Sequence, residues 1–327
     1  MILPLDYKKP LLTIAIPTWN RADKLQDALS HILPQVTSYL HLIEILVSDN
    51  ASTDNTIEVI KKFKNNYPTL NFEYYTQLEN TGFYGNFYKC ISLGTGEYLW
   101  LLSDDDFVFD GVVKILIDVL VNHKPGAVFL SNWTDDKFAK QQFYFEQVTK
   151  NKFFSNKPYR HSLISSVIFK NSITIDDNIF KLLKNNSLLG YAVFLKAIYN
   201  YENFFILYGN SLAVNNDKAN VTYNALRAFT IDLAACLEIV KPLYPKTIVN
   251  KIANSFLATN IFKHYKCYKF KNSFRNYEGN DTLWIFKDFV IYKVFWTKII
   301  FLILLPKIFC KFTYFIYEKF FKINQTL

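Results

Sequence analysis

The amino-acid sequence predicts an α/β fold, with a mostly parallel, open sheet flanked by helices and a helical, amphipathic C-terminal extension. Three observations predict it. Short apolar stretches alternate with stretches of helical periodicity over about the first 130 residues. Polar clusters follow three of the apolar stretches. Glycine almost disappears after Gly209, leaving only Gly279, and this change in composition indicates a separate helical region towards the C-terminus.

The predicted strands are short and almost wholly apolar, which is typical of strands that are covered on both faces. Helical periodicity separates them, and a crossover between parallel strands of one sheet is right-handed. We therefore expect an open sheet with helices on both faces. The expected strands are residues 12–16, 43–47, 72–75, 98–102 and 127–130.

The first expected helix covers residues 25–33, where apolar side chains recur at helical spacing. Asn20 or Asp23 is expected to cap it. Residues 137–216 are less regular and are expected to shape the substrate site. The same helical periodicity marks residues 53–63, a segment beginning near Asp110, and residues 225–270.

The chain has 327 residues, half of them hydrophobic, and a formal net charge of +9. An excess of basic charge indicates an anionic partner, such as nucleic acid, an acidic lipid or a phosphorylated substrate. The basic excess is marked near the C-terminus, beside long apolar stretches. A nucleic-acid-binding protein is expected instead to interleave basic and aromatic residues on one face of the sheet domain. We therefore expect no nucleic acid as a partner.

The four cysteines form no C-x-x-C pair, and none lies near a histidine at the spacing of a zinc finger. A zinc site and a disulfide framework are therefore not expected. The first 17 residues lack a charged segment followed by a long apolar run, so no signal peptide is expected. These features favour a site that faces the cytoplasm.

Three polar clusters stand at the predicted carboxyl ends of strands, namely residues 17–21, 48–50 and 103–106. In open α/β sheets, ligands bind in the crevice outside those ends. Segments that are distant in sequence are thus expected to meet in one crevice.

The acidic cluster of Asp104, Asp105 and Asp106 follows a very apolar strand. Adjacent carboxylates repel one another and need a cation or strong hydrogen-bond donors nearby. A hard divalent ion such as Mg²⁺ or Mn²⁺ meets that need and bridges a diphosphate, whose growing negative charge it neutralises. The alternative is a solvated, aspartate-rich loop, which is less probable at the end of a buried strand.

The other two clusters suit a nucleotide. Asp49 is placed to bind a base or ribose edge, whereas residues 52–54 are expected to be only a helix cap. Trp19 is suited to stacking on a base, and Arg21 to binding a phosphate. The alternatives are that Trp19 is a core residue and that Arg21 is a surface charge.

Together these segments resemble glycosyltransferases of family 2, and among them the bacterial enzymes that build surface polysaccharides such as O antigen, capsule or lipooligosaccharide. The resemblance covers roughly residues 11–130 and rests on the order and spacing of four strings. These are TIAIPTWNR (13–21), EILVSDNASTDNT (44–56), LENTGFYGNFYKCISLGTGEYLWLLSDDD (78–106) and FVFDG (107–111).

The resemblance implies a GT-A fold, a nucleotide-diphosphate sugar as the donor, a divalent metal (Mn²⁺ or Mg²⁺) and inversion at the anomeric carbon. It also implies a lipid-linked or lipopolysaccharide-type glycan as the acceptor. The favoured metal ligands are Asp106 and Asp105. The predicted donor site comprises Pro17, Thr18, Trp19, Asn20, Arg21, Asp49, Asn50, Asn80, Gly82, Asn86, Asp104 and Asp105.

The chain departs from the family pattern at three places. Ser103 stands where many relatives have the first acid of the metal motif, and Gly85 stands where a basic residue is common. Residues 188–193 lack the acidic pair that often opens a helix there and supplies the general base. An inverting transfer needs a base within reach of the acceptor hydroxyl.

Asp176 or Asp177 is the predicted base, although a polar turn explains these two residues equally well. Because the usual acidic pair is missing, a non-catalytic sugar-nucleotide-binding or scaffold relative remains the alternative to an enzyme. Turnover of a nucleotide sugar separates the two.

Residues 284–327 are rich in aromatic and aliphatic side chains interrupted by lysine. The longest uncharged run is far shorter than the roughly 20 residues that span a bilayer. After Pro306, one side of a predicted helix carries Lys307, Lys311, Glu318 and Lys322, a pattern typical of an interfacial helix on an anionic membrane. The alternative is a helix that packs on its own domain.

The predicted organisation is therefore a catalytic GT-A domain (1–215), a helical region (216–283) and amphipathic membrane-associating helices (284–327). The expected partners are the sugar donor, the glycan acceptor and an anionic membrane surface. The expected location is the inner face of the cytoplasmic membrane.

Overall fold

The computed structural model describes residues 9–134, 143–171, 177–214, 227–265, 287–306 and 310. The chain divides into two compact units. Unit 1 comprises residues 1–185 and 189–221, and unit 2 comprises residues 186–188 and 222–327.

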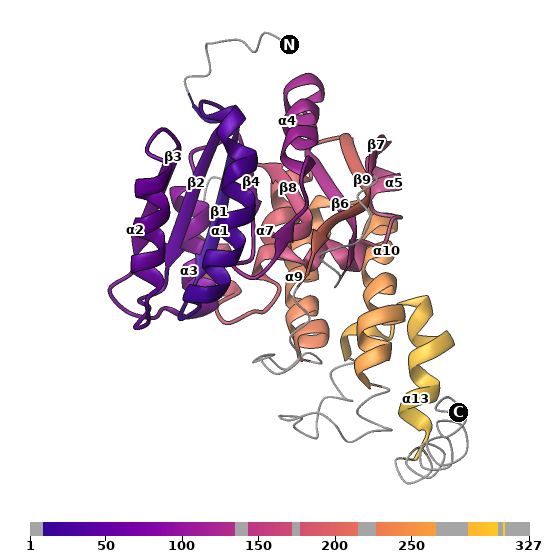
Figure 1. Cartoon of the computed structure of the whole chain (residues 1–327). Coiled ribbons are helices and arrows are strands. Elements are labelled where there is room, and N and C mark those ends of the chain that lie inside the picture. Colours follow the sequence, from indigo (N-terminus) through magenta and orange to yellow (C-terminus); the bar gives the residue numbers. More distant parts are fainter. Residues whose placement is uncertain are drawn as a thin grey trace, which may run out of the picture. The chain divides into compact units, whose positions relative to one another are not determined.

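Unit 1 is built on one sheet, which has nine strands among the described residues, in the order β3-β2-β1-β4-β8-β6-β9-β5, with β7 paired to β9 (Figure 1). All five predicted strands are present. Of the other four, β7, β8 and β9 lie in the less regular stretch 137–216, and β5 has only two residues. The strands are β1 (Leu12–Thr18), β2 (Ile43–Asp49), β3 (Asn71–Thr76), β4 (Tyr98–Leu101), β5 (Phe107–Val108), β6 (Ala127–Thr134), β7 (Tyr144–Thr149), β8 (Val167–Lys170) and β9 (Asn203–Ala213).

The sheet is parallel from β3 to β4, as predicted, and mixed beyond it. Strand β8 is antiparallel to both β4 and β6, so β6 again runs in the direction of β4, and β9 is parallel to β6. The carboxyl ends of β1, β2, β4, β6 and β9 therefore lie at one edge of the sheet. The two-residue strand β5 pairs with the carboxyl end of β9. The loop after β4 thus runs along this edge.

Helices cover both faces of the sheet. The even-numbered apolar residues of β1 pack into one core with α1 (Ala22–Val36), α2 (Thr56–Asn66) and α4 (Val112–His123), because alternate residues of a strand face opposite sides. Helix α3 (Gly82–Leu93) contacts β1 and β2 from the other side (Figure 1). The remaining helices of unit 1 are α5 (Lys150–Phe153), α6 (Asp177–Leu182) and α7 (Leu189–Ile198), with 3-10 turns η1 (Thr37–Tyr39), η2 (Pro158–Ser162) and η3 (Ile164–Ser166).

The cap of the first helix was predicted wrongly. Helix α1 follows Arg21, and no side chain at that position caps it. Instead, the backbone N–H of Ala22 donates to Asp54 from the loop after β2, over 3.1 Å. Asp54 also accepts from the backbone N–H of Thr56, where α2 begins. One carboxylate therefore serves the N-termini of two helices, a contact that sequence spacing does not show.

Unit 2 is helical in its described parts. It contains η5 (Ala228–Asp232), α9 (Leu233–Val240), η6 (Lys241–Leu243), α10 (Lys246–Phe256), η7 (Leu257–Ile261), η8 (Phe295–Ile299) and α13 (Ile300–Leu304), of which η5, η7 and η8 are π-helical turns. None of the described helices is long and apolar enough to cross a membrane. Lys307, Lys311 and Lys322 lie outside the described residues, as do the predicted boundaries after residues 215 and 283.

Candidate functional site

The loops after β1 and β4 are joined through one buried carboxylate. Asp104 accepts a hydrogen bond from the Thr18 hydroxyl at 2.8 Å and forms an ion pair with the Arg21 guanidinium, also at 2.8 Å. The carboxylate is buried, whereas the Arg21 side chain is 40% exposed. Two of the three polar clusters predicted from the sequence therefore meet at the carboxyl edge of the sheet.

Burial and charge act against each other at this pair. Burial disfavours the ionised form of Asp104 and raises its pKa to about 6, although Arg21 and Thr18 oppose the shift. Burial also disfavours the charged Arg21, but the negative charges of Asp104 and Asp105 outweigh it and raise the pKa of Arg21. Asp104 therefore titrates close to neutral pH, while Arg21 stays a cation.

The two neighbouring acids differ in their access to solvent. Asp105 accepts from the Ser103 hydroxyl at 2.6 Å and lies 3.2 Å from Arg21, with its side chain 20% exposed. Asp106 is buried, and its backbone N–H donates to the Ser103 carbonyl at 3.3 Å. Ser103, where relatives have an acid, thus holds Asp105 in place.

A residue missed by the sequence reasoning supports the acidic loop from behind. The Ser165 hydroxyl accepts from the backbone N–H of Ser103 at 3.0 Å, and the Ser165 carbonyl accepts from the Trp100 indole at 2.9 Å. Ser165 belongs to η3, within sequence that shows no regular pattern. No signal in the sequence connects it with residue 103.

The loop after β2 is fixed to the loop after β1. The side-chain oxygen of Asn20 accepts from the backbone N–H of Thr53 at 2.7 Å, and the backbone N–H of Asn20 donates to the Ser52 hydroxyl at 2.8 Å. Asp49 is buried, and its carboxylate accepts from the backbone N–H of Ser52 at 3.1 Å. Residues 52–54 therefore link the two loops rather than only capping α2.

The loop after β3 joins the same edge through amide side chains. Asn50 donates to the side-chain oxygen of Asn80 at 2.8 Å and accepts from the Gln77 amide, also at 2.8 Å. Asn80 in turn accepts from the backbone N–H of Gly82, whose φ of +75° suits glycine. Gln77 was not predicted, although its place at the end of β3 matches that of the other polar clusters.

Asn86 is buried and ties two strand ends together. Its amide donates to the carbonyls of Thr18 at 3.2 Å and Ser48 at 3.0 Å. Both amide hydrogens are therefore used within the protein, and this residue positions the neighbouring loops. Gly85, just before it, has no room for a side chain: a Cβ there would lie 2.2 Å from the Thr81 hydroxyl oxygen. A larger residue at position 85 would therefore require Thr81 or the backbone to move.

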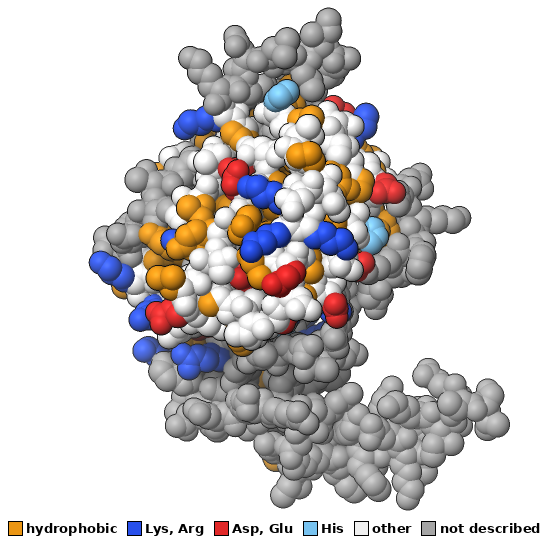
Figure 2. Space-filling model, turned by 60° about the vertical axis from the view of Figure 1, so that its left-hand side comes forward, with side chains coloured by type: hydrophobic (Ala, Val, Ile, Leu, Met, Phe, Trp, Pro, Cys, Tyr) orange, Lys and Arg blue, Asp and Glu red, His pale blue; other side chains and the backbone are white. Residues whose placement is uncertain are grey.

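Trp19 is 49% exposed, so the alternative that it is a core residue is wrong. Arg21, which pairs with two acids, is not an isolated surface charge either. Leu78 and Phe83, from the loop after β3 and the start of α3, are also exposed. Figure 2 shows one face of the molecule, on which hydrophobic side chains reach the surface between acidic and basic ones. The loop after β1 therefore carries an exposed aromatic side chain, Trp19, two residues before Arg21.

The predicted base stays a prediction. Asp176 lies outside the described residues, and Asp177 is the first residue of α6, but its side chain is not described. Within unit 2, an aspartate from another segment binds residues 186 and 187, which lie just before the stretch where relatives carry their acidic pair. Asp232 accepts from the backbone N–H of Ser187 at 2.8 Å, and its backbone carbonyl accepts from the Asn186 amide at 2.9 Å.

Comparisons with known proteins bear on the family and the fold of the chain. The family model described as Glycosyl transferase family 2 matches residues 13–178, just over half of the chain. Abequosyltransferase RfbV of Salmonella typhimurium is 40% identical over 108 residues, which are 32% of this chain and 31% of that protein. The matched region thus spans about a third of the length of this curated relative.

Solved structures match over more of the chain at low identity. Residues 1–349 of S. aureus TarS, in complex with UDP-GlcNAc, match with a TM-score of 0.57 and 13% identity, over 79% of this chain and 80% of that one. Mannosyltransferase PcManGT from Pyrobaculum calidifontis, in complex with GDP-Man and Mn²⁺, matches with a TM-score of 0.54 and 16% identity, over 89% and 83%. These likenesses confirm the predicted GT-A fold.

Proposed function

Because the chain belongs to glycosyl transferase family 2, and is therefore a glycosyltransferase, we propose that it moves a sugar from a nucleotide-diphosphate donor to a hydroxyl of a lipid-linked or lipopolysaccharide-type glycan, with inversion. The observation that carries this proposal is the convergence of Thr18 and Arg21 on Asp104 at the carboxyl edge of the sheet. Nucleotide ligands bind at that edge in open α/β sheets.

In this proposal Arg21 holds the diphosphate. Asp104 orients the guanidinium from the buried side, and the exposed part of Arg21 offers N–H donors to phosphate oxygens. As the bond from the anomeric carbon to the phosphate oxygen breaks, negative charge grows on the leaving nucleoside diphosphate. A fixed cation at that position stabilises the transition state more than the bound substrate. Trp19 stacks on the base, and Asp49 binds the base or ribose edge.

We propose that Asp105 and Asp106 hold the divalent metal. Carboxylate oxygens are the ligands that Mg²⁺ and Mn²⁺ prefer, and Mg²⁺ is usually bound through one or two carboxylates together with substrate phosphates and water. No group of three acidic, histidine or cysteine side chains able to hold a metal occurs among the described residues. The residues that would hold the metal are Asp105, which Ser103 holds through a hydrogen bond of 2.6 Å, and the buried Asp106, with phosphate oxygens and water completing the site. When bound, the metal neutralises charge on the leaving diphosphate.

A base must take the proton of the acceptor hydroxyl as its oxygen bonds to the anomeric carbon. We propose Asp176 or Asp177 for this role, as the sequence suggests. The alternative, a non-catalytic sugar-nucleotide-binding or scaffold relative, predicts binding without turnover.

The nature of the acceptor rests on the sequence resemblance and on relatives such as abequosyltransferase RfbV. A lipid-linked acceptor lies in the cytoplasmic leaflet, so we propose that the enzyme works as a peripheral protein at the inner face of the cytoplasmic membrane. Nucleic acid is not a proposed partner.

A thermal-shift screen of nucleotide sugars with Mn²⁺ present tests the proposed donor. A ligand that binds only the folded protein raises the free energy of unfolding, by about 2.7 kcal/mol when the ligand concentration is a hundred times Kd. We expect one nucleotide family to raise the melting temperature of the wild-type chain, and Arg21→Ala to abolish the rise. No shift with any nucleotide sugar would contradict the proposal.

A further inference from the structure

One segment of unit 2 exposes large hydrophobic side chains. Ile291, Trp296, Phe301 and Leu304 are 71%, 55%, 62% and 70% exposed, respectively. Elsewhere in the described parts of unit 2, leucine, isoleucine, phenylalanine and tyrosine side chains are buried or half-buried. Scattered exposed apolar residues need no explanation, but several within 14 residues mark an interaction surface.

This segment is docked on its other side, so the exposed side chains do not result from a helix that lacks packing. Its buried residues recur at helical spacing: Phe289, Tyr292, Phe295, Ile299 and Leu302. The backbone N–H of Val294 donates to the Asn254 side chain of α10 at 3.1 Å. The segment, which is helical except for a turn at residues 290–292, therefore has an inner face that packs on unit 2 and an outer face left to solvent.

The polar atom of the central aromatic side chain is already satisfied. The Trp296 indole donates to the Val290 carbonyl at 2.7 Å, which places Trp296 beside the turn that carries Ile291. What Trp296 offers to a partner is therefore apolar ring surface. Phe301 and Leu304 are three residues apart on α13 and are neighbours on the helix surface.

The π-helical turn η8 affects how these side chains line up. Trp296 and Phe301 are five residues apart, which on a regular α-helix separates them by about 140°. A π-turn contains about one more residue per turn, so the angle between Trp296 and Phe301 around the helix axis is smaller. It brings Trp296 and Phe301 closer to one face.

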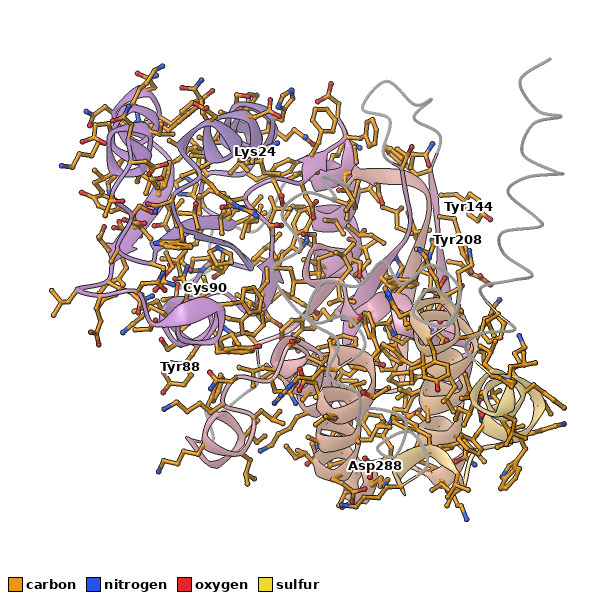
Figure 3. The ribbon with its side chains drawn as sticks, turned by 90° about the horizontal axis from the view of Figure 1, so that it is seen from below. Lys24, Tyr88, Cys90, Tyr144, Tyr208 and Asp288 are labelled. Carbon is orange, nitrogen blue, oxygen red and sulfur yellow. The ribbon has the colours of Figure 1, made fainter. Side chains whose placement is uncertain are left out.

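Positive charge accompanies the apolar side chains. Lys287, Lys293 and Lys298 are exposed on the same segment, and the one acidic residue among positions 287–306, Asp288, is half-buried. Figure 3 labels Asp288 in this helical part of the chain. Apolar side chains interleaved with lysine, with tryptophan among them, are typical of a helix that lies in the headgroup region of an anionic bilayer.

We propose that residues 287–306 form a membrane-docking face that binds an anionic lipid leaflet. The four exposed apolar side chains enter the boundary between headgroups and acyl chains, while Lys293 and Lys298 bind headgroup phosphates. A second copy of the chain fits this face less well, because a symmetric dimer would place the same lysines against one another. The inference rests on the peripheral membrane location proposed above and names the face that binds the lipid; it is independent of the transfer reaction, because lipid binding needs no sugar donor.

Flotation of the full-length chain with vesicles tests the docking face. The vesicles contain phosphatidylcholine with about a third phosphatidylglycerol, and high salt is expected to weaken binding only in part. We expect Trp296→Ser with Phe301→Ser, and separately Ile291→Ser with Leu304→Ser, each to lower the partition coefficient about tenfold. The matched control is Tyr144→Ser with Phe145→Ser, which removes two exposed aromatic residues from β7 in unit 1 (Figure 3 labels Tyr144) and should leave binding unchanged.

The charge contribution has its own matched pair. Lys293→Ala with Lys298→Ala should weaken binding to anionic vesicles, whereas Lys61→Ala with Lys62→Ala, on α2, should not. Undiminished binding in both apolar variants would place the lipid contact elsewhere in the chain and overturn the proposal. The proposal would also be overturned if the wild-type chain failed to float with the vesicles, or if it formed a concentration-dependent dimer that the apolar variants abolish. Release of nucleoside diphosphate by the variants in solution is read separately, so failure of the docking face leaves the proposed reaction untouched.

Discussion

Arg21 and Asp104 are 83 positions apart in sequence, yet their side chains meet at 2.8 Å. The contact joins the loop after β1 to the loop after β4 and gives the carboxyl edge of the sheet a cation backed by a buried carboxylate. Because Asp104 is held in a low-dielectric position, its ionisation couples the site to pH.

The first prediction concerns the stability cost of that carboxylate. The pKa of Asp104 is about 6 in the folded protein against 3.8 for an unperturbed group. A raised carboxyl pKa favours folding below the unfolded value, and the contribution is lost as pH rises through 6. Asp104→Asn, which mimics the protonated form, should therefore stabilise the protein at pH 7 by up to about 3 kcal/mol. The gain should vanish near pH 4.

Denaturant unfolding at the two pH values measures this difference. The variant should also lose transfer activity, because Arg21 is no longer held by a charge. A variant that is less stable than wild type at pH 7 would show that Asp104 stabilises the fold through its charge.

The second prediction concerns His161, whose burial destabilises the protein as pH falls, whereas burial of Asp104 destabilises it as pH rises. His161 is buried among aromatic rings, with the Phe129 ring centroid at 4.2 Å, and neither ring nitrogen has a hydrogen-bond partner among the residues that the structure describes. Burial lowers its pKa from 6.5 to about 3. The unfolded chain gains a proton below pH 6.5 that the folded chain does not accept, so acid favours unfolding. His161→Phe should flatten the loss of stability between pH 6.5 and 4.

Melting temperatures across that range check the effect, with His161→Leu as a second variant in case phenylalanine is too large. If the melting temperatures of the wild-type chain and the variant changed in parallel with pH, His161 would be accessible to protons in the folded protein.

The third prediction concerns the close contact between Gly85 and Thr81. A Cβ at position 85 would lie 2.4 Å from the Thr81 Cβ, far inside contact distance. Gly85→Ala should destabilise the protein by roughly 1–3 kcal/mol, as overpacking does. Thr81→Gly removes the opposing atoms, so the double variant should lose less than the sum of the single losses. Additive losses in a double-mutant cycle would argue against the contact.

The fourth prediction concerns the metal. Asp105 is the partly exposed member of the acidic cluster and is held by Ser103 at 2.6 Å. Asp105→Asn keeps the shape but removes the charge, and transfer should fall by roughly two orders of magnitude or more at fixed Mn²⁺. Wild-type activity should disappear in excess chelator and return with Mn²⁺. Activity that survives chelation would rule out a metal role for this cluster.

The sequence predicted the parallel half of the sheet because strands such as Leu12–Thr18 and Ile43–Asp49 are buried apolar runs with clear ends. Strands β7 to β9 were not predicted. Their pairing depends on partners distant in sequence, and polar residues such as Glu146 interrupt the alternation of β7. Short apolar runs also do not by themselves distinguish antiparallel from parallel neighbours.

The residue types of the site were predictable, but their partners were not. Spacing placed Asp104 and Arg21 at strand ends, and only the fold shows that they pair. The roles of Ser165 and Gln77 could not be predicted, because neither residue belongs to a sequence motif. The function of a single serine or glutamine depends on neighbours that only the fold reveals. Asn86 was predicted as part of the donor site, and the fold adds that its amide donates to the carbonyls of Thr18 and Ser48.

The most direct test of the central claim is release of nucleoside diphosphate from nucleotide sugars, followed in the wild-type chain and in Arg21→Ala. The assay needs no identified acceptor, because water accepts the sugar slowly. We predict that one donor is turned over in the presence of Mn²⁺, and that Arg21→Ala lowers kcat/KM by about a hundredfold, comparable to removing one transition-state donor. The account is contradicted if the wild-type chain binds a donor but releases no nucleoside diphosphate, even with a glycan acceptor. It is also contradicted if Arg21→Ala has the same kcat/KM as the wild-type chain.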